Sequence, residues 1–220
     1  MNYFIFMIKL PLKSKTTNYV YLILLAILLV LGVIDAFSPI GRANLFYLVI
    51  AALIVLISPY LLKALKLELS GNTYIAWWLF IIVSCYLSNR YNLYKTFWFY
   101  DVILHTFSGV ILAFFFSDLL YPLNSTKNYI KETPIIMIVA ICWLCAIASA
   151  GIWEMNEFVY DIFTHQDVQR NLLQEKELIS SSWQNSGILD TMNDMINGTV
   201  GGLVGSIFLF FKYKKERKVC

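Results

Sequence analysis

The strongest constraint on this chain is a series of six apolar segments, each close to the length that crosses a lipid bilayer. The segments cover residues 19–34, 45–65, 73–88, 99–121, 134–163 and 188–211. A transmembrane helix needs about 20 mostly apolar residues, with a range of about 17–25. Hydrophobic residues make up 59% of the 220-residue chain, whereas a soluble domain has about 45–50%. The sequence therefore predicts an all-α polytopic membrane protein with about six transmembrane helices.

The two ends of the chain flank these segments. The first residues lack the small-residue cleavage site of a signal peptide, and their apolar part precedes the charges. We interpret residues 1–18 as a cytoplasmic N-terminal tail and residues 19–212 as one six-helix transmembrane domain. Residues 213–220 then form a basic cytoplasmic tail.

Lysines and arginines are distributed unevenly along the chain, and this indicates its orientation. With the N-terminus in the cytoplasm, 12 of the 17 basic residues fall on the cytoplasmic side and 5 on the other. Loops rich in lysine and arginine stay in the cytoplasm. The sequence therefore predicts a multi-pass protein of the cell membrane with both termini in the cytoplasm.

The fifth apolar segment is longer than a bilayer requires. About 30 residues make a helix of about 45 Å, against a hydrocarbon core of about 30 Å. This helix either projects beyond the membrane or bends near residues 149–151, so its polar end is expected at or near the interface.

Three of the six segments carry polar residues spaced three or four apart, so that they share one helix face. These are Asp101 and His105 at the start of the fourth segment, Glu154, Glu157 and Asp161 at the end of the fifth, and Asp190, Asp194 and Asn197 at the start of the sixth. The predicted topology puts all three sets on the outer side, although these residues were not used to derive it. We therefore expect them to form one site at the outer membrane face.

This expected site holds six acids, but His105 is the only ionisable nitrogen within the three sets. Carboxylates held together away from water repel one another unless a cation or a proton joins them. A divalent metal, protonation, or a cation such as Arg90 or Arg170 folding in would each solve the problem. Carboxylate, amide and imidazole ligands suit magnesium, calcium, manganese or zinc, and the spacing does not select among these ions.

Single residues of the site allow other interpretations. Asp101 and Asp190 lie in the first turn of a helix, where an acid caps free N–H groups, and a lone histidine is often a hydrogen-bonded core residue.

The candidate metal ligands are Asp101, His105, Glu154, Glu157, Asp161, Asp190, Asp194 and Asn197. The candidate catalytic residues are His105 and Glu154.

Three functional hypotheses follow. The first is a metal-dependent site that acts on a lipid or an envelope precursor, with membrane lipids as partners and a lipid-linked molecule or headgroup as substrate. The second is a non-enzymatic binder or a cation- or proton-coupled transporter, and the third is a structural membrane protein. No feature of the sequence indicates nucleic-acid binding, and the enzymatic and non-enzymatic hypotheses both stay open.

Other motifs favour packing over chemistry. Gly201 and Gly205 form a GxxxG motif, which is typical of closely approaching membrane helices. The CxxC of Cys142 and Cys145 lies among apolar residues, which favours core filling over redox or zinc chemistry. The mixed-charge connection 164–187 is long enough to cover the site, although a solvated linker would look the same.

The polar motifs also resemble a known family. The stretches Asp101-x3-His105-x2-Ser108-Gly109, Trp153-Glu154-x2-Glu157-Phe158-x2-Asp161, Gln169, and Asp190-Thr191-x2-Asp194-Met195-x-Asn197-Gly198 resemble the YjdF-like bacterial inner-membrane proteins. More loosely, the order of these helices is similar to the VanZ-like proteins linked to glycopeptide resistance, where a glutamine is expected in place of Glu157. The resemblance implies a membrane location and one shared site, but no reaction.

Overall fold

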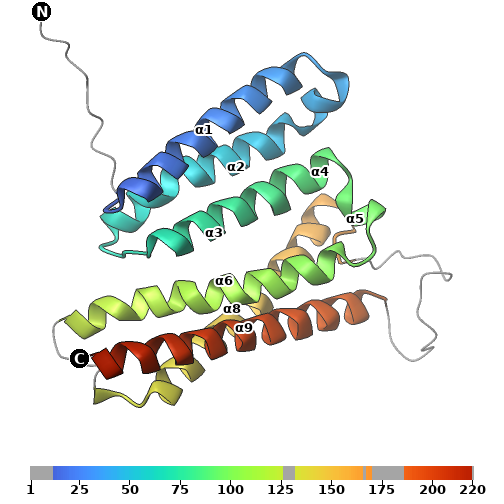
Figure 1. Cartoon of the computed structure of the whole chain (residues 1–220). Coiled ribbons are helices and arrows are strands. Elements are labelled where there is room, and N and C mark those ends of the chain that lie inside the picture. The colour runs from blue at the N-terminus through green and yellow to red at the C-terminus, as the bar shows by residue number, and fades with distance from the viewer. Residues whose placement is uncertain (1–11, 126–131, 166, 170–185, 220) are drawn as a thin grey trace, which may run out of the picture. The chain divides into compact units, whose positions relative to one another are not determined.

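The computed structural model describes residues 12–125, 132–165, 167–169 and 186–219. Within these residues all regular structure is helical, and six helices are long and apolar enough to cross a membrane. The predicted all-α polytopic class is therefore confirmed. The chain divides into two compact units, Met1–Leu93 and Tyr94–Cys220, which are described separately (Figure 1). The domain boundaries predicted from the sequence stay predictions.

The first unit consists of two long helices and a third that changes its winding. These elements are α1 (Lys15–Ala36), α2 (Pro39–Ala64), α3 (Gly71–Ile81), the π-helix η1 (Ile82–Leu87) and α4 (Ser88–Arg90). Serine side chains cap α1, α2 and α3, each accepting a hydrogen bond from a backbone N–H in the first turn.

Three predicted helix starts were wrong by a few residues because of these caps. The first helix begins at Lys15 rather than near residue 19, since Ser14 caps it. The second helix begins at Pro39 rather than near residue 45, since Ser38 caps it and proline suits the first helical turn. The third begins at Gly71, because Ser70 is its N-cap rather than part of a separate turn.

The core of the first unit consists of aromatic and aliphatic side chains, and the polar groups of its Trp78 and Tyr21 are hydrogen-bonded. Trp78 is fully buried, and its indole N–H donates to the Ser58 hydroxyl at 3.0 Å. Tyr21 packs against the Trp78 ring, and its hydroxyl donates to the Leu56 carbonyl at 3.1 Å. The polar groups of Trp78 and Tyr21 thus both have partners, as apolar surroundings require.

An acid at the end of α1 is also buried in this unit. Asp35 is 1% exposed. Its carboxylate accepts hydrogen bonds from the Tyr86 hydroxyl at 2.7 Å and from Arg90 Nε at 3.0 Å. Gly41 is essential beside it, since a methyl group there would lie 2.4 Å from Asp35 Cα. Asp35 directly follows the first apolar segment, residues 19–34.

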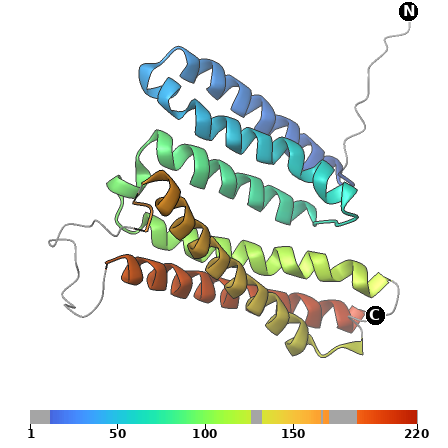
Figure 2. The ribbon, with the colours of Figure 1, turned by 180° about the vertical axis from the view of Figure 1, so that it is seen from behind.

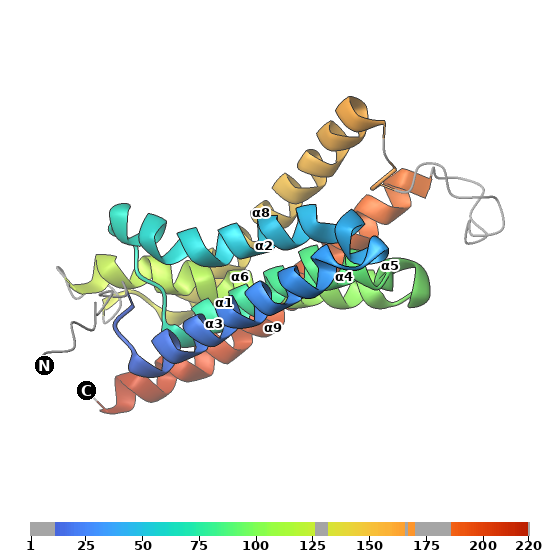
Figure 3. The same cartoon turned by 90° about the horizontal axis from the view of Figure 1, so that it is seen from above.

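The second unit contains three long helices. A short helix, α5 (Leu93–Thr96), leads into α6 (Tyr100–Ser125), and α8 (Ile135–Thr164) and α9 (Ser186–Val219) follow. Viewed from behind and from above, α8 crosses the α6–α9 pair obliquely (Figures 2 and 3). α8 is one continuous helix of 30 residues with no break at residues 149–151. Of the two alternatives, the uninterrupted helix is therefore the one that the structure adopts.

Small residues bring these helices into close contact. A methyl group on Gly201 would lie 1.9 Å from the Thr106 carbonyl oxygen, and one on Gly109 would lie 2.1 Å from the Gly198 carbonyl oxygen. Side chains at these positions would force α6 and α9 apart. A methyl group on Gly205 would approach Ala113 Cβ to 2.9 Å. The predicted packing role of the glycines is confirmed.

The remaining predictions concern the core cysteines and the chain ends. Cys142 is fully buried in the apolar core of the second unit, which agrees with core filling. The basic residues 213–219 continue α9 as helix. Residues 1–11 and most of the 164–187 connection lie outside the described residues.

Candidate functional site

The three polar sets of the sequence lie at one end of the second unit. The first turns of α6 and α9 and the last turns of α8 share this end (Figure 1). Alternating helix directions produce this arrangement, because α8 runs back toward the start of α6 and α9 begins where α8 ends.

His105 stands at the centre of the cluster. Its Nε2 lies 3.5 Å from Asp101 Oδ1, one turn earlier on α6, and 3.5 Å from Asp194 Oδ2 on α9. Each residue offers one ligand atom, and these atoms all lie within 4.8 Å of one another. The cluster thus joins two helices through one imidazole and two carboxylates.

The spacing of these atoms suits ligands around an ion. An N–H···O hydrogen bond normally spans about 2.7–3.2 Å, which is shorter than both 3.5 Å separations. Four ligands held tetrahedrally at about 2.0–2.2 Å from an ion would lie roughly 3.3–3.6 Å apart, which matches the two separations from His105. The two carboxylate oxygens lie within 4.8 Å of each other, so the three side chains could hold an ion between them.

The cluster is shielded from solvent. The side chain of Asp194 is 5% exposed, and those of His105 and Asp101 are 13% and 14% exposed. Charges in such surroundings interact more strongly than in water because little solvent screens them. A protonated His105 would balance one of the two acids and leave a negative charge at the site.

Glu154 adds a third carboxylate from α8. It is 5% exposed, and neither of its carboxylate oxygens has a hydrogen-bond partner among the described residues. Its charge acts on His105 and Asp194, which places it beside the cluster. A buried carboxylate without a partner is unfavourable unless it is protonated or binds a cation.

Helix packing positions Glu154 against the other two helices. One turn before it, Ala150 contacts α9 where a methyl group on Gly198 would lie 3.2 Å from Ala150 Cβ. That same methyl group would lie 3.8 Å from the His105 carbonyl oxygen. The Trp143 indole N–H also donates to the Thr199 carbonyl at 2.9 Å. The small residue at 198 thus lets α8 and α6 approach α9 beside the cluster.

Two of the predicted ligands on α8 have partners elsewhere. Glu157 accepts a hydrogen bond from the Trp153 indole on its own helix at 2.7 Å. The oxygens of Asp161 accept from the backbone N–H groups of Val168 and Gln169 at 2.9 and 3.0 Å. Asp161 therefore holds the turn that follows α8, and the structure does not bring it into the three-residue cluster.

The other predicted residues lie next to Asp194 on α9. Asp190 is one turn earlier and acts on Asp194 electrostatically. Asn197 is half-buried, one turn later. Neither belongs to the three-residue group whose ligand atoms converge. The roles of all eight residues as ligands, and of His105 and Glu154 in catalysis, stay predictions.

Thr191 is a polar neighbour that the sequence analysis did not treat as a site residue. Its hydroxyl accepts a hydrogen bond from the Gln169 side-chain amide at 3.2 Å, and it lies near the Glu154 carboxylate without a hydrogen bond to either of its oxygens. Thr191 lies three residues before Asp194, so it shares the helix face of that acid. This spacing was the signal that could have identified it.

An arginine that neutralises the acids of the candidate site was another possibility, but the first unit does not support it. The Arg90 Nε is hydrogen-bonded to Asp35 at 3.0 Å, and Arg170 lies outside the described residues. A metal ion or protonation would each balance the acids within the described residues, and a cation from residues 170–185 stays a prediction.

One family model matches this chain. It is described as "Predicted membrane protein (DUF2238)" and matches residues 19–215, which include every residue of the candidate site. The match confirms the resemblance to the YjdF-like proteins, and it provides no link to the VanZ-like proteins. No curated protein and no solved structure matches the chain.

Proposed function

The chain belongs to the DUF2238 family of predicted membrane proteins, and from this premise we propose that Asp101, His105 and Asp194 bind a divalent metal ion. One observation supports this most directly. His105 Nε2 is 3.5 Å from both carboxylates, and beside them the buried Glu154 carboxylate has no hydrogen-bond partner among the described residues. A divalent cation would offset this excess of acids.

The ligands suggest which ions fit. Two or three carboxylates with one imidazole suit zinc or manganese, whereas calcium and magnesium prefer oxygen ligands only. Glu154 would either add a further ligand or act as a proton acceptor beside the ion. A divalent ion held there would supply Lewis-acid chemistry toward a phosphoryl or carbonyl oxygen.

The location of the cluster indicates the kind of substrate. It lies at the ends of helices long enough to span a membrane, so a substrate reaching it along the bilayer would be a lipid or a lipid-linked envelope precursor. We propose that the protein resides in the cell membrane with both termini in the cytoplasm and this site on the outer side. The excess of basic residues in the segments assigned to the cytoplasm supports this orientation.

Metal content of the purified full chain in detergent tests the central claim. We expect about one zinc or manganese ion per chain, detected by elemental analysis, and a metal affinity that falls about 10- to 100-fold or more in Asp194→Asn and His105→Gln. Glu216→Gln is the matched control, because this exposed acid lies near the other end of α9. Wild-type protein that binds no metal after incubation with either ion would refute the proposal.

Two further measurements test the substrate and the orientation. Fluorescent protein fused to the C-terminus should fluoresce if that end is cytoplasmic. Lipid extracts incubated with wild-type protein should show a product by mass spectrometry that is absent with Asp194→Asn. If metal binds but no lipid or precursor changes in any extract, the enzymatic part of the proposal is wrong.

A further inference from the structure

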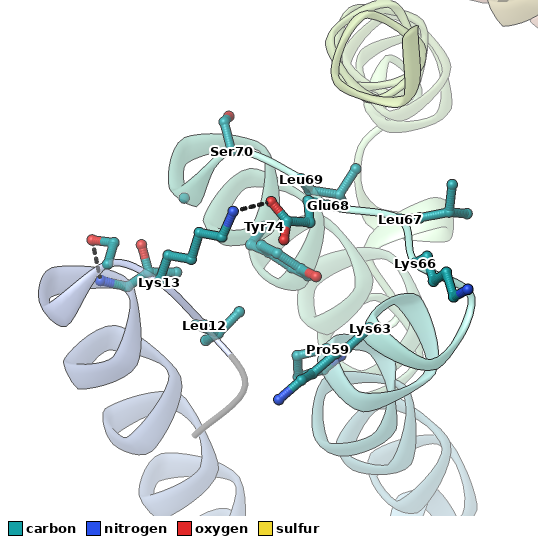
Figure 4. A pocket seen from close by; sticks show the side chains of 13 residues that line it. Leu12, Lys13, Pro59, Lys63, Lys66, Leu67, Glu68, Leu69, Ser70 and Tyr74 are labelled. Atoms are coloured by element: carbon teal, nitrogen blue, oxygen red, sulfur yellow. Dashed lines mark hydrogen bonds and ion pairs between the residues drawn. The ribbon is translucent and has the colours of Figure 1, made fainter. Parts of the chain in front are cut away.

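An open cavity of about 670 Å³ lies at one end of the first unit, far along its helices from the buried Asp35. It is formed by the start of α1, the end of α2 and the start of α3 (Figure 4). Its volume falls within the range of about 300–1,000 Å³ that is usual for ligand sites. No residue of the proposed metal site lies in this unit, so the cavity is a separate feature.

Basic side chains dominate the charge of this cavity. Lys13, Lys63 and Lys66 line it, with Glu68 as the acid among the lining residues. Lys13 forms an ion pair with Glu68 (Figure 4). Lys63 and Lys66 have no ion pair with any described residue, and both are exposed. Two positive charges without a described counter-charge therefore lie at the end of α2, where their side chains extend in different directions (Figure 4).

The backbone between α2 and α3 fixes the position of these lysines. Lys66 adopts a left-handed conformation with φ 59°, and its N–H donates to the Lys63 carbonyl at 3.0 Å. The next N–H, that of Leu67, donates to the Leu62 carbonyl at 2.8 Å. This turn closes α2 and presents both lysines at the helix end.

Apolar residues form much of the remaining wall. Leu12, Pro59, Leu67 and Leu69 line the cavity together with the ring of Tyr74 (Figure 4). A free inorganic anion would gain nothing from this surface. A molecule with a charged phosphate and an apolar part fits both the lysines and the leucines.

We propose that this cavity binds the headgroup of an anionic phospholipid, with its phosphate drawing the exposed, flexible side chains of Lys63 and Lys66 together and its acyl chains along the apolar wall. The cavity lies at the ends of three membrane-length helices, which is the depth of lipid headgroups. Basic pockets between transmembrane helices on the cytoplasmic side are known to suit anionic headgroups. This inference is independent of the metal site.

Native mass spectrometry of the full chain in detergent tests the proposal. The probes are phosphatidylglycerol, zwitterionic phosphatidylcholine and inorganic phosphate. We expect phosphatidylglycerol to bind at least about 10-fold more tightly than phosphatidylcholine, and its affinity to fall about 10-fold or more in Lys63→Gln/Lys66→Gln. Glu68→Gln should raise the affinity about 2- to 5-fold, because it releases Lys13 from its ion pair.

The matched control is Lys214→Gln/Lys215→Gln, which removes two exposed lysines at the end of α9 in the second unit. It should bind phosphatidylglycerol as the wild type does. Equal loss in both double variants would mean that general surface charge attracts the lipid, and this result would overturn the proposal. Inorganic phosphate that binds as tightly as phosphatidylglycerol would overturn the lipid assignment. Elution volume and thermal midpoint verify that each variant is folded.

Discussion

Asp35 in the first unit and Glu154 in the second are both buried acids on membrane-length helices, but their surroundings are opposite. Asp35 accepts hydrogen bonds from Tyr86 and Arg90, so its charge is balanced within the protein. Glu154 has no hydrogen-bond partner among the described residues and lies beside two further acids.

The difference indicates what each acid contributes. A buried charge is retained at low energetic cost only when it is paired and hydrogen-bonded. Asp35 is paired with Tyr86 and Arg90 without any ligand, so we interpret these three residues as structural. Glu154 lacks such a pairing among the described residues, and a buried acid of this kind is typical of a site that binds a ligand or transfers a proton. The following predictions test this contrast.

The largest effect is expected from Asp35→Asn. The change removes the negative charge that Tyr86 and Arg90 contact, and breaking a buried ion pair costs about 3–5 kcal/mol. Arg90 keeps 18% side-chain exposure, so we expect the lower end, a free-energy loss of about 3 kcal/mol. The thermal midpoint of the full chain in detergent measures this, and metal binding should be unchanged. An unchanged midpoint would mean that the Asp35 group does not stabilise the first unit.

An intermediate effect is expected from Gly201→Ala. The added methyl group would lie 1.9 Å from the Thr106 carbonyl oxygen, and overpacking costs about 1–3 kcal/mol. α6 and α9 must separate, which moves Asp194 away from His105, so the midpoint and the metal affinity should both fall.

The control for this change is Gly151→Ala, where the nearest atom to the new methyl group is Met195 Cε at 3.7 Å. Alanine is favoured over glycine inside a helix by up to about 1 kcal/mol. The control should therefore be neutral or slightly stabilising. If both variants behave alike, close contact between α6 and α9 does not hold the cluster together.

The smallest effect on stability, and one of opposite sign, is expected from Glu154→Gln. This change removes a buried carboxylate that has no hydrogen-bond partner among the described residues, so the metal-free protein should be unchanged or more stable by up to about 1 kcal/mol. Its metal affinity or activity should fall. A large loss of stability in the metal-free state would show that Glu154 is a structural residue like Asp35.

The periodicity of the sequence was sufficient to predict part of the site. Asp101 and His105 lie four residues apart, and any α-helix brings such a pair together. Their separation of 3.5 Å in the structure follows from that local geometry. The same rule placed Asp194 on a shared helix face with Asp190 and Asn197.

Periodicity was not sufficient to predict which residues of one polar set lie beside the cluster and which do not. Glu154, Glu157 and Asp161 share a helix face, yet Glu154 lies beside the cluster while Asp161 binds two backbone N–H groups. α8 crosses α6 and α9 obliquely (Figure 2), so only part of its polar face meets the other helices. A crossing angle depends on packing over the whole interface and is not encoded in residue spacing.

The sequence by itself determined the helical class, the six membrane-length segments and the acids that share each helix face, because hydrophobicity and helical periodicity act locally. The tertiary structure alone decided that His105 meets Asp194, that Glu154 is buried beside them, and that Arg90 pairs with Asp35 instead. These contacts join residues far apart in the chain. They depend on how closely the glycines let the helices approach and on which side chains remain to balance each buried charge.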